Sequence, residues 1–419
     1  MNGSPIHSIG IIICAFLVLF MQAGFAMTAT GFTRAKNAGH TMAMNMMVVV
    51  IAALAYWAVG HGVRMGGKGF FLSGPASDIA VSALFVSSAA YLNVAAAIPI
   101  GAMSERWTFK SFVVYGFFIA MFTYPLYANW VWGGGWLAGL GRNFGLGHGV
   151  VDFAGSSVVH MVGGVSGLAG AVVLGPRMGK YRANGTPVAI PGHHIPMAIV
   201  GCLILFFGWF GFNSGPALAD GGLRIGVIAV NTMFASVAAS FSAMCSMWFV
   251  YGKPDLSLSA NGLLGGLAAI SGPCAYVSPG GAVMIGLVAG VLCCASVFFV
   301  ERKLKVDDPA GAVSVHGACG AWGMTVLGLF ADGTYGDGLN NVPGTVKGLF
   351  YGGASQFAAQ VIGVVVNFVF VFVVMFVFFK LLDKIIPLRV SEEVEFEGLD
   401  QSEVAVTAYP DFSITKTRR

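Results

Sequence analysis

The chain has 419 residues, of which 57% are hydrophobic and only 10% are charged. An ordinary soluble domain carries about 25% charged residues, so a soluble protein of this length could not bury so much apolar surface. The composition therefore excludes an ordinary soluble domain and favours a protein with lipid around it. The formal net charge of +4 is no nucleic-acid signal. The seven cysteines show neither metal-ligand spacing nor a disulfide framework, so we expect no metal site.

Eleven apolar stretches are candidates for crossing a bilayer, which takes about 20 residues in a helix. The first is interpreted as a true crossing, because residues 1–8 lack the positive region of a signal peptide. The sixth and eighth are short or glycine-rich. The predicted crossings are Ile9–Phe32, His40–Met65, Asp78–Met103, Phe109–Trp132, Val150–Leu174, Pro196–Phe212, Ile225–Tyr251, Leu256–Ala275, Gly280–Val300, Pro309–Phe330 and Gln356–Leu382.

The positive charges predict the orientation of these crossings. If the N-terminus lies outside, most of the 22 lysines and arginines fall in the inside loops and the C-terminal end. Cytoplasmic loops of membrane proteins carry this excess. We therefore predict that the N-terminus lies outside and the C-terminus inside, which leaves five basic residues outside: Arg64, Lys68, Arg142, Arg224 and Lys347.

The fifth and tenth stretches carry the same spaced pattern, D-x-A-G-x-x-x-V-H-x-x-x-G-x-x-G. It occurs as Asp152–Gly167 and again as Asp308–Gly323. The copies lie five crossings apart, so their helices run in opposite directions. An odd offset of this kind indicates an inverted-topology repeat, in which the functional site lies between the halves. The predicted fold is thus all-α, with eleven transmembrane helices forming an inverted five-plus-five repeat and a last long helix.

Each copy of the pattern places a histidine eight residues after its aspartate. If each helix begins at its aspartate, His160 and His316 lie about 12 Å deep from opposite faces. Because the hydrocarbon core is about 30 Å thick, the two imidazoles approach one another near the midplane. Intramembrane ionisable residues are costly and usually functional, although a single buried histidine is more often a satisfied core residue. Two neutral imidazoles can share a proton, one donating and one accepting.

The two aspartates fit the role of helix caps. Asp308 precedes Pro309, which is a favoured residue at the first helical position, and capping explains Asp308 almost fully. Asp152 has two interpretations that stay open. It is a cap, and it can in addition supply negative field for a cation outside.

Further stretches complete a resemblance to the ammonium transporter family (Amt/Mep/Rh), and it extends over nearly the whole chain. The C-terminal tail, with Glu395–Asp400 followed by Ala408-Tyr409, is also similar to the family's cytoplasmic tail. The matching membrane stretches are Met21–Met27, Arg34–Asn37, Gly101–Arg106, Asp152–His160, Gly208–Asn213, Asn231-Thr232 and Asp308–Gly323.

The resemblance implies an eleven-helix homotrimer with one pore in each subunit. It also implies that His160 and His316 are twin pore histidines. Trp132 is similar to the aromatic residue that helps to recruit ammonium outside, although it also fits an interfacial tryptophan belt. Phe212 matches one phenylalanine of the outer gate, and plain core packing is the alternative.

Several positions depart from the family pattern. The second gate phenylalanine falls on Tyr91, and a further phenylalanine one turn earlier falls on Ser87. The serine that lines the outer cation site falls on Pro216, which has no hydroxyl. The first helix reads Thr28-Ala29-Thr30 where the family has a glutamate, and the loop through Arg142 and His148 is longer than usual. Outer recruitment is thus expected at Trp132, Asp152, Tyr91 and Pro216.

The expected function is ammonium or ammonia transport through a hydrophobic pore with deprotonation near the outer mouth. A bare cation is very expensive in hydrocarbon, but ammonium can lose a proton and potassium cannot. The alternative is an ammonium sensor on the same scaffold, which the missing serine and glutamate favour. An intramembrane enzyme is the weakest alternative, because no metalloprotease-like spacing exists and His193-His194 is expected to be solvated. No cofactor is expected.

The expected domain division is a membrane domain over residues 1–382 and a cytoplasmic tail over 383–419. The repeat halves are about 9–174 and 196–330, and the last helix spans 356–382. The tail is too short for an output enzyme, so a sensor would need a partner or a further domain. The acidic tail residues fit a solvated face, whereas the resemblance implies packing under the pore and contact with a PII-type regulatory protein. The expected location is the plasma or inner membrane, with multiple passes.

Overall fold

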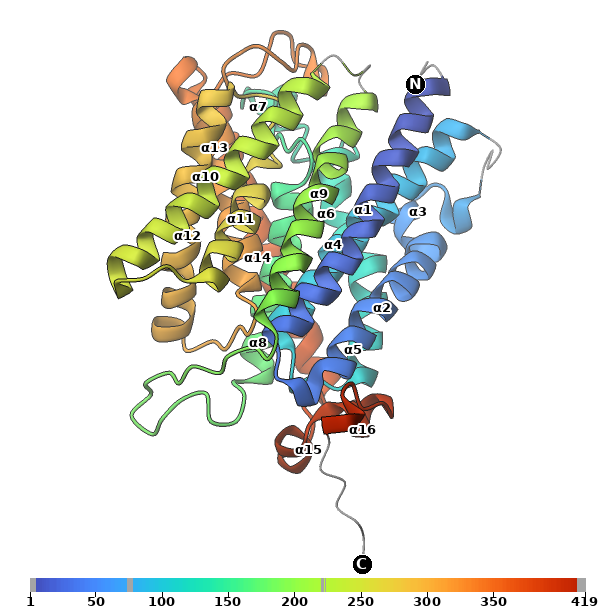
Figure 1. Ribbon diagram of the computed structural model, residues 1–419. Helices are drawn as coiled ribbons and strands as arrows, with labels where there is room; N and C mark the ends of the chain where they lie inside the picture. Colours follow the sequence, from blue (N-terminus) through green and yellow to red (C-terminus); the bar gives the residue numbers. More distant parts are fainter. Residues whose placement is uncertain (1–4, 74–77, 220–221, 223, 413–419) are drawn as a thin grey trace, which may run out of the picture.

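The computed structural model describes residues 5–73, 78–219, 222 and 224–412. This part of the chain is helical, with isolated β-bridges as its only extended pairing. Long helices run side by side through the molecule, and the N-terminal and C-terminal ends of the chain lie at opposite ends of the bundle (Figure 1). An odd number of crossings places the two ends in this way. The predicted all-α membrane fold is confirmed.

Within the described ranges, ten helical segments are long and apolar enough to cross a membrane, and α11 is an eleventh, shorter one. The first five crossings are α1 (Pro5–Phe32), α2 with η2 and α3 (Ala38–Ala55, Tyr56–Gly60, His61–Arg64), α4 (Ile79–Met103), α5 with η4 and α6 (Phe109–Phe118, Ile119–Thr123, Tyr124–Trp132), and η5 with α8 (Ser156–Met161, Val162–Leu174). The others are α9 (Ile195–Ala219), α10 (Ile225–Tyr251), α11 (Leu256–Ile270), α12 with η6 (Pro279–Phe299, Val300–Leu304), η7 with α13 (Val313–Ala318, Cys319–Phe330), and α14 (Ala354–Asp383).

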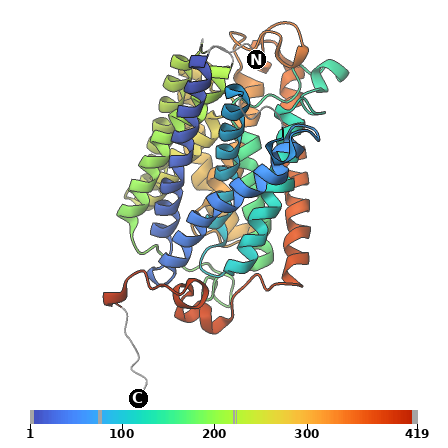
Figure 2. The ribbon, with the colours of Figure 1, turned by 90° about the vertical axis from the view of Figure 1, so that its right-hand side faces the viewer.

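Equivalent helices of the two halves pack in equivalent ways. The first helices of the halves, α1 and α9, pack along one another, α4 packs on α8, and α11 packs on α13. The last long helix, α14, contacts both α8 and α13 and so joins the two halves along one side of the bundle (Figure 2). Short helices α7 (Leu140–Phe144), α15 (Glu392–Glu397) and α16 (Leu399–Val404) lie outside the crossings.

The predicted starts of the fifth and tenth crossings, at Val150 and Pro309, are wrong. Their helices begin at Ser156 and Val313, because the preceding residues form a loop that folds back over the helix end. Pro309 is therefore not the first helical residue. Each of these crossings starts later in the sequence than predicted. Fewer helical residues therefore separate the start of the crossing from its histidine.

The ends of the sixth and eighth crossings also differ from the prediction. Helix α9 continues beyond Phe212 to Ala219 and contains Pro216. Helix α11 ends at Ile270 instead of Ala275, because the turns that follow it bond to the loop before η5. Two backbone bonds join these segments, from Phe153 N to Gly272 O at 3.1 Å and from Ala154 N to Ser271 O at 2.9 Å.

Candidate functional site

The D-x-A-G pattern forms the same capping loop in both halves. The glycine of each copy has positive φ, 122° at Gly155 and 74° at Gly311, a backbone region that other residues rarely adopt. This turn brings the aspartate back over the helix start. The Asp308 carboxylate accepts the N–H groups of Ala312 and Val313 at 3.0 and 2.8 Å. The Asp152 carboxylate is more fully engaged, accepting five bonds of 2.7–3.0 Å from Gly155 N, Ser156 N, Ser157 N, Ser157 Oγ and Val158 N.

The later glycines of the pattern bring the two halves into backbone contact beside the histidines. A Cβ added at Gly164 would lie 2.3 Å from the backbone nitrogen of Gly317. A Cβ added at Gly320 would lie 2.5 Å from the carbonyl oxygen of Ser156. Small residues permit such crossings of membrane helices. The histidines themselves lie in η5 and η7, wide π-type turns of a kind that is frequent at functional sites.

The structure brings His160 and His316 into direct contact in the interior. Their Nδ1 atoms lie 3.2 Å apart, and the rings stack with centroids 5.2 Å apart and planes 20° apart. Only 0% and 4% of the two residues are exposed, so the pair is closed off from solvent and lipid. A bond between two Nδ1 atoms requires one ring to donate and the other to accept, which gives the pair a proton that either ring can hold.

Two aromatic residues that the sequence reasoning did not select complete the surroundings of the pair. Trp209 stacks on His160 with centroids 4.9 Å apart, and Phe25 lies 6.0 Å from His316. The Trp209 indole N–H is bound to Ser271 Oγ at 2.9 Å, which fixes the ring. Both residues lie within the stretches that carried the family resemblance, so a signal was present in the sequence.

An unbroken series of rings leads from the surface to the histidine pair. Trp132 lies 6.0 Å from Tyr91, Tyr91 lies 4.5 Å from Phe212, and Phe212 lies 5.3 Å from His160. Tyr91 is 6% exposed and Phe212 is fully buried, so both rings lie within the packed interior. The structure thus brings together the two residues expected at the gate.

Pro216 and Tyr91 are linked through one carbonyl group. In a regular helix the carbonyl of Phe212 would accept the N–H of residue 216, but proline has none. The Tyr91 hydroxyl donates to this Phe212 carbonyl instead. The two departures from the family pattern are therefore complementary. Pro216 leaves the Phe212 carbonyl of α9 without its backbone donor, and the hydroxyl of Tyr91 in α4 donates a hydrogen bond to that carbonyl instead.

A cavity of about 560 Å³ opens on the side of Tyr91 away from the histidine pair. Trp132, Asp152, Tyr91 and Pro216 all line it, together with Ser87 and Ser88 of α4. The Trp132 indole donates to the carbonyl oxygen of Asp152 at 2.6 Å, which holds the ring at the cavity wall. Arg64, at the end of α3, also lines the cavity. Its position in the chain predicts an outside location, and nothing in the neighbouring residues of the chain points to the cavity.

A smaller pocket of about 30 Å³ lies on the other side of the histidine pair. Its polar lining residues are Thr28, Asn45, Asn261 and His316. This volume suffices for one or two water molecules. Thr28 belongs to the stretch in which the family's glutamate is missing, so a neutral hydroxyl lines the pocket there.

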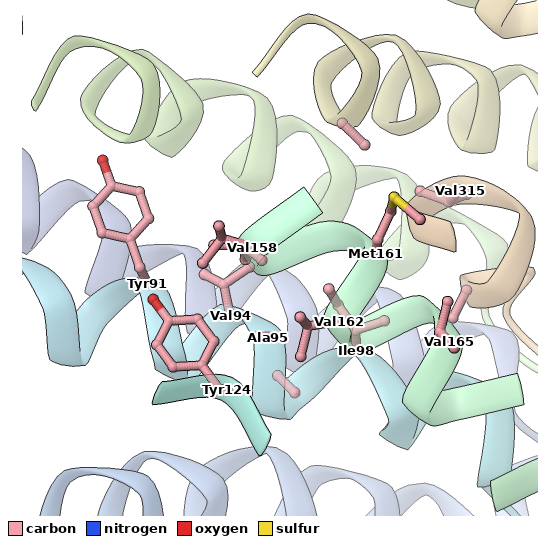
Figure 3. Packing of buried hydrophobic residues seen from close by; sticks show 14 of the residues in the cluster. Tyr91, Val94, Ala95, Ile98, Tyr124, Val158, Met161, Val162, Val165 and Val315 are labelled. Atoms are coloured by element: carbon pink, nitrogen blue, oxygen red, sulfur yellow. The ribbon is translucent and has the colours of Figure 1, made fainter. Parts of the chain in front are cut away.

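Apolar side chains of α4, η5 and α8 pack together beside Tyr91 (Figure 3). Figure 3 shows Tyr91 at one end of this packing, followed by Val94 and Ile98 of α4 against Val158 of η5 and Val162 of α8. These four aliphatic residues are at most 2% exposed. A hydrated ion has no polar partners along such walls, whereas a small neutral molecule loses little on entering them.

Comparison with known proteins identifies the family of the chain. The Ammonium Transporter Family profile matches residues 9–409. Ammonium transporter Amt2 of Archaeoglobus fulgidus is 43% identical over 423 residues, covering 99% of this chain and 90% of its own. A solved structure named "Sensor Amt Protein" superimposes with a TM-score of 0.87 at 32% identity, covering 95% of this chain and 98% of its own.

Candida albicans Mep2, at 24% identity and a TM-score of 0.80, shares the fold and covers 94% of this chain and 88% of its own. The family consists of transporters and not of enzymes. Its profile covers almost all of the sequence, including both halves that supply the histidine pair. This chain belongs to the ammonium transporter family.

Proposed function

We propose that this protein conducts ammonium as neutral ammonia through the path between α4, α8, α9 and α13. The cation enters the outer cavity, where Trp132, Asp152 and Tyr91 favour positive charge. At the gate of Tyr91 and Phe212 it transfers its proton to solvent water in the outer cavity, which leaves neutral ammonia. Ammonia then passes His160 and His316 by hydrogen bonding and leaves through the pocket at Thr28.

The buried histidine pair is the observation that carries this proposal. Its polar nitrogens interrupt walls that are otherwise apolar, and they are satisfied by a guest that both donates and accepts hydrogen bonds. Ammonia is such a guest. Potassium resembles ammonium in size and charge, but it cannot release a proton, so its transfer into the apolar segment retains the full cost of a bare ion. The Nδ1–Nδ1 contact also offers a route for the proton.

The test is ammonium and methylammonium flux in vesicles reconstituted with purified protein. The double variant His160→Ala/His316→Ala should lose ammonium-selective flux, because the apolar segment then has no hydrogen-bonding partner. His194→Asn, which changes an exposed imidazole outside the path, is the matched control and should keep wild-type flux. Full ammonium-selective flux in the double variant would remove the basis of the proposal.

A second candidate function is an ammonium sensor that binds the cation without conducting it appreciably. Two observations favour it: the Tyr91 hydroxyl is bonded to the Phe212 carbonyl across the proposed gate, and one similar solved structure is named "Sensor Amt Protein". Calorimetric binding and vesicle flux measured on the same preparation separate the candidates. Saturable ammonium binding with flux no greater than that of empty vesicles would favour the sensor.

We further propose a homotrimer in the plasma or inner membrane, with a membrane domain over residues 1–382 and a cytoplasmic tail over 383–419. The positive-charge bias supports an outside N-terminus, and fluorescence of a C-terminal green fluorescent protein fusion tests the inside tail. Native mass spectrometry tests the trimer. A PII-type regulatory protein is the expected partner of the cytoplasmic face, and a pull-down with such a protein tests it.

A further inference from the structure

One cation of the protein itself already lies against the tryptophan of the outer cavity. The guanidinium carbon of Arg64 is 6.0 Å from the centroid of the Trp132 ring, a cation–π distance. Its Nη1 donates to Ser88 Oγ, which in turn donates to Leu84 O at 2.6 Å. The charge therefore points into the cavity between α4 and α6.

The backbone holds Arg64 in this position. Asn129 of α6 donates from Nδ2 to the Arg64 carbonyl at 2.8 Å, so the end of α3 is bound to the helix that carries Trp132. A Cβ added at Gly133 would lie 2.8 Å from the same carbonyl, which shows how closely the two segments approach. The guanidinium and the indole are thus fixed to one another by structure outside the cavity.

In the part of the chain that the structure describes, no carboxylate forms an ion pair with Arg64. Among the described residues, the arginines that form ion pairs are Arg34, Arg177 and Arg389, all at the opposite end of the molecule. The one acidic residue lining the described cavity, Asp152, already accepts five hydrogen bonds from the start of its own helix. The cavity therefore holds a positive charge with an aromatic face and a hydroxyl as partners.

We propose that Arg64 is a tethered competitor of ammonium at Trp132 and thereby sets how much ammonium is needed to occupy the outer cavity. The inference rests on the proposed function, because it assumes that ammonium enters at Trp132. An entering cation must displace the guanidinium from the ring or bind close to a like charge. Two unit charges about 6 Å apart, with an effective dielectric constant of about 20–80, repel one another enough to weaken binding about 3- to 100-fold.

The experiment compares Arg64→Gln, which removes the charge but keeps a donor for Ser88, with Arg64→Lys, which keeps the charge. Ammonium binding is measured by calorimetry and flux in vesicles. We expect Arg64→Gln to lower the dissociation constant and the half-saturating concentration about 3- to 100-fold. Arg64→Lys should remain within about threefold of wild type. Arg142→Gln removes an exposed positive charge from the same end of the molecule without touching the cavity, and it should leave both values unchanged.

The outcomes separate this inference from the proposed function. An Arg64→Gln protein with wild-type thermal stability and an unchanged or raised dissociation constant would overturn the tethered competitor, since a purely structural arginine predicts that result. If Arg64→Gln binds ammonium more tightly than wild type but no variant shows ammonium flux, the tethered competitor is supported and the conducting function is not. No ammonium binding in wild type or Arg64→Gln would overturn both.

Discussion

At the scale of single residues, the proposed gate depends on the Tyr91 hydroxyl, which takes the place of a backbone N–H at the Phe212 carbonyl. Tyr91→Phe removes the bond to the Phe212 carbonyl and leaves the ring. A buried hydrogen bond of this kind contributes about 0.5–1.5 kcal/mol, so we expect the gate to open more readily and flux to rise about 2- to 10-fold. Ammonium flux in vesicles measures the effect.

The matched control for Tyr91→Phe is Tyr127→Phe. Tyr127 is also buried and donates its hydroxyl to a backbone carbonyl, that of Gly363 at 3.3 Å, but it does not line the cavity. The Tyr127→Phe protein should be destabilised by about as much as Tyr91→Phe, but its ammonium flux should equal that of wild type. Unchanged or reduced flux in a well-folded Tyr91→Phe protein would show that this bond does not hold the gate closed.

At the scale of the helical elements, the crossing of the two halves depends on backbone contact at Gly164. Gly164→Ala would place a methyl group 2.3 Å from Gly317 N, where no flexible side chain can move aside. Overpacking of this kind costs about 1–3 kcal/mol, and here it also pushes apart the segments that carry the histidines. We expect a lower melting temperature in detergent and reduced flux.

Gly226→Ala is the comparison for Gly164→Ala, because Gly226 also lies in a helix and a Cβ there meets nothing within 4 Å. It should behave as wild type. If both alanine variants have the same melting temperature and flux, the close approach at Gly164 does not determine the position of the histidines.

A second element-scale feature is the C-terminal tail, which caps a membrane helix from a distance. Asp400 accepts the N–H groups of Gly39 and His40 at 3.1 and 2.9 Å, at the start of α2. Asp400→Ala leaves these donors unpaired at a cost of about 1–2 kcal/mol, so the undocked tail should become about 5- to 30-fold more populated. Limited proteolysis of the tail measures this as faster cleavage.

The control for the tail is Glu393→Gln, since Glu393 belongs to the same acidic segment but is exposed. It should be cleaved at the wild-type rate. Equal cleavage of Asp400→Ala and wild type would mean that other contacts suffice for docking. Those contacts include Lys36 Nζ to the Glu395 carbonyl at 2.7 Å and His193 Nε2 to the Tyr409 hydroxyl at 2.8 Å.

The element scale also shows what the sequence could and could not predict. The crossings and the paired histidines were predictable, because apolar length and a repeated spacing are properties of the chain alone. The starts at Ser156 and Val313 were not, because they depend on carboxylates that fold back across a positive-φ glycine. The π-type turns and the position of Arg64 against Trp132 were also missed, since both arise from packing between distant segments.

His193 illustrates the same limit. The position of His193-His194 in a predicted cytoplasmic loop favours solvated side chains. In the structure both ring nitrogens of His193 are engaged, one with the Thr33 carbonyl and the other with Tyr409 of the tail. The solvated interpretation is therefore wrong for His193, because the tail returns to this loop over more than half of the sequence.

At the scale of the whole molecule, a buried ion network joins loops from both halves at the end that carries the tail. Arg177 binds Asp307 through Nε at 2.8 Å and Glu105 through Nη1 at 2.6 Å, and Arg34 also binds Glu105. Arg106 donates to the Asp307 carbonyl at 2.8 Å. The side chains of Glu105, Arg177 and Asp307 are at most 2% exposed, so the network replaces water as their partner.

Asp307→Asn should destabilise the whole protein, because it leaves the buried Arg177 partly uncompensated. Breaking a buried pair in this way costs about 3–5 kcal/mol. Burial alone would raise the pKa of Asp307, but Arg106 and Arg177 outweigh burial and hold that pKa well below its ordinary value of 3.8. A lowered folded-state pKa means that the stabilisation is complete above pH 3.8 and is lost as the pH falls toward the folded-state pKa.

Thermal unfolding in detergent between pH 7 and pH 3 therefore gives two readouts. The melting temperature of Asp307→Asn should be lower than that of wild type at pH 7, and the difference should narrow below pH 3.8 as wild type begins to lose the contribution of Asp307. Asp411→Asn removes a carboxylate from the exposed tail at the same end of the molecule and should follow wild type throughout. If the difference between Asp307→Asn and wild type stays constant over this pH range, the carboxylate charge is not what joins the two halves, and the loops are held by their backbone bonds instead.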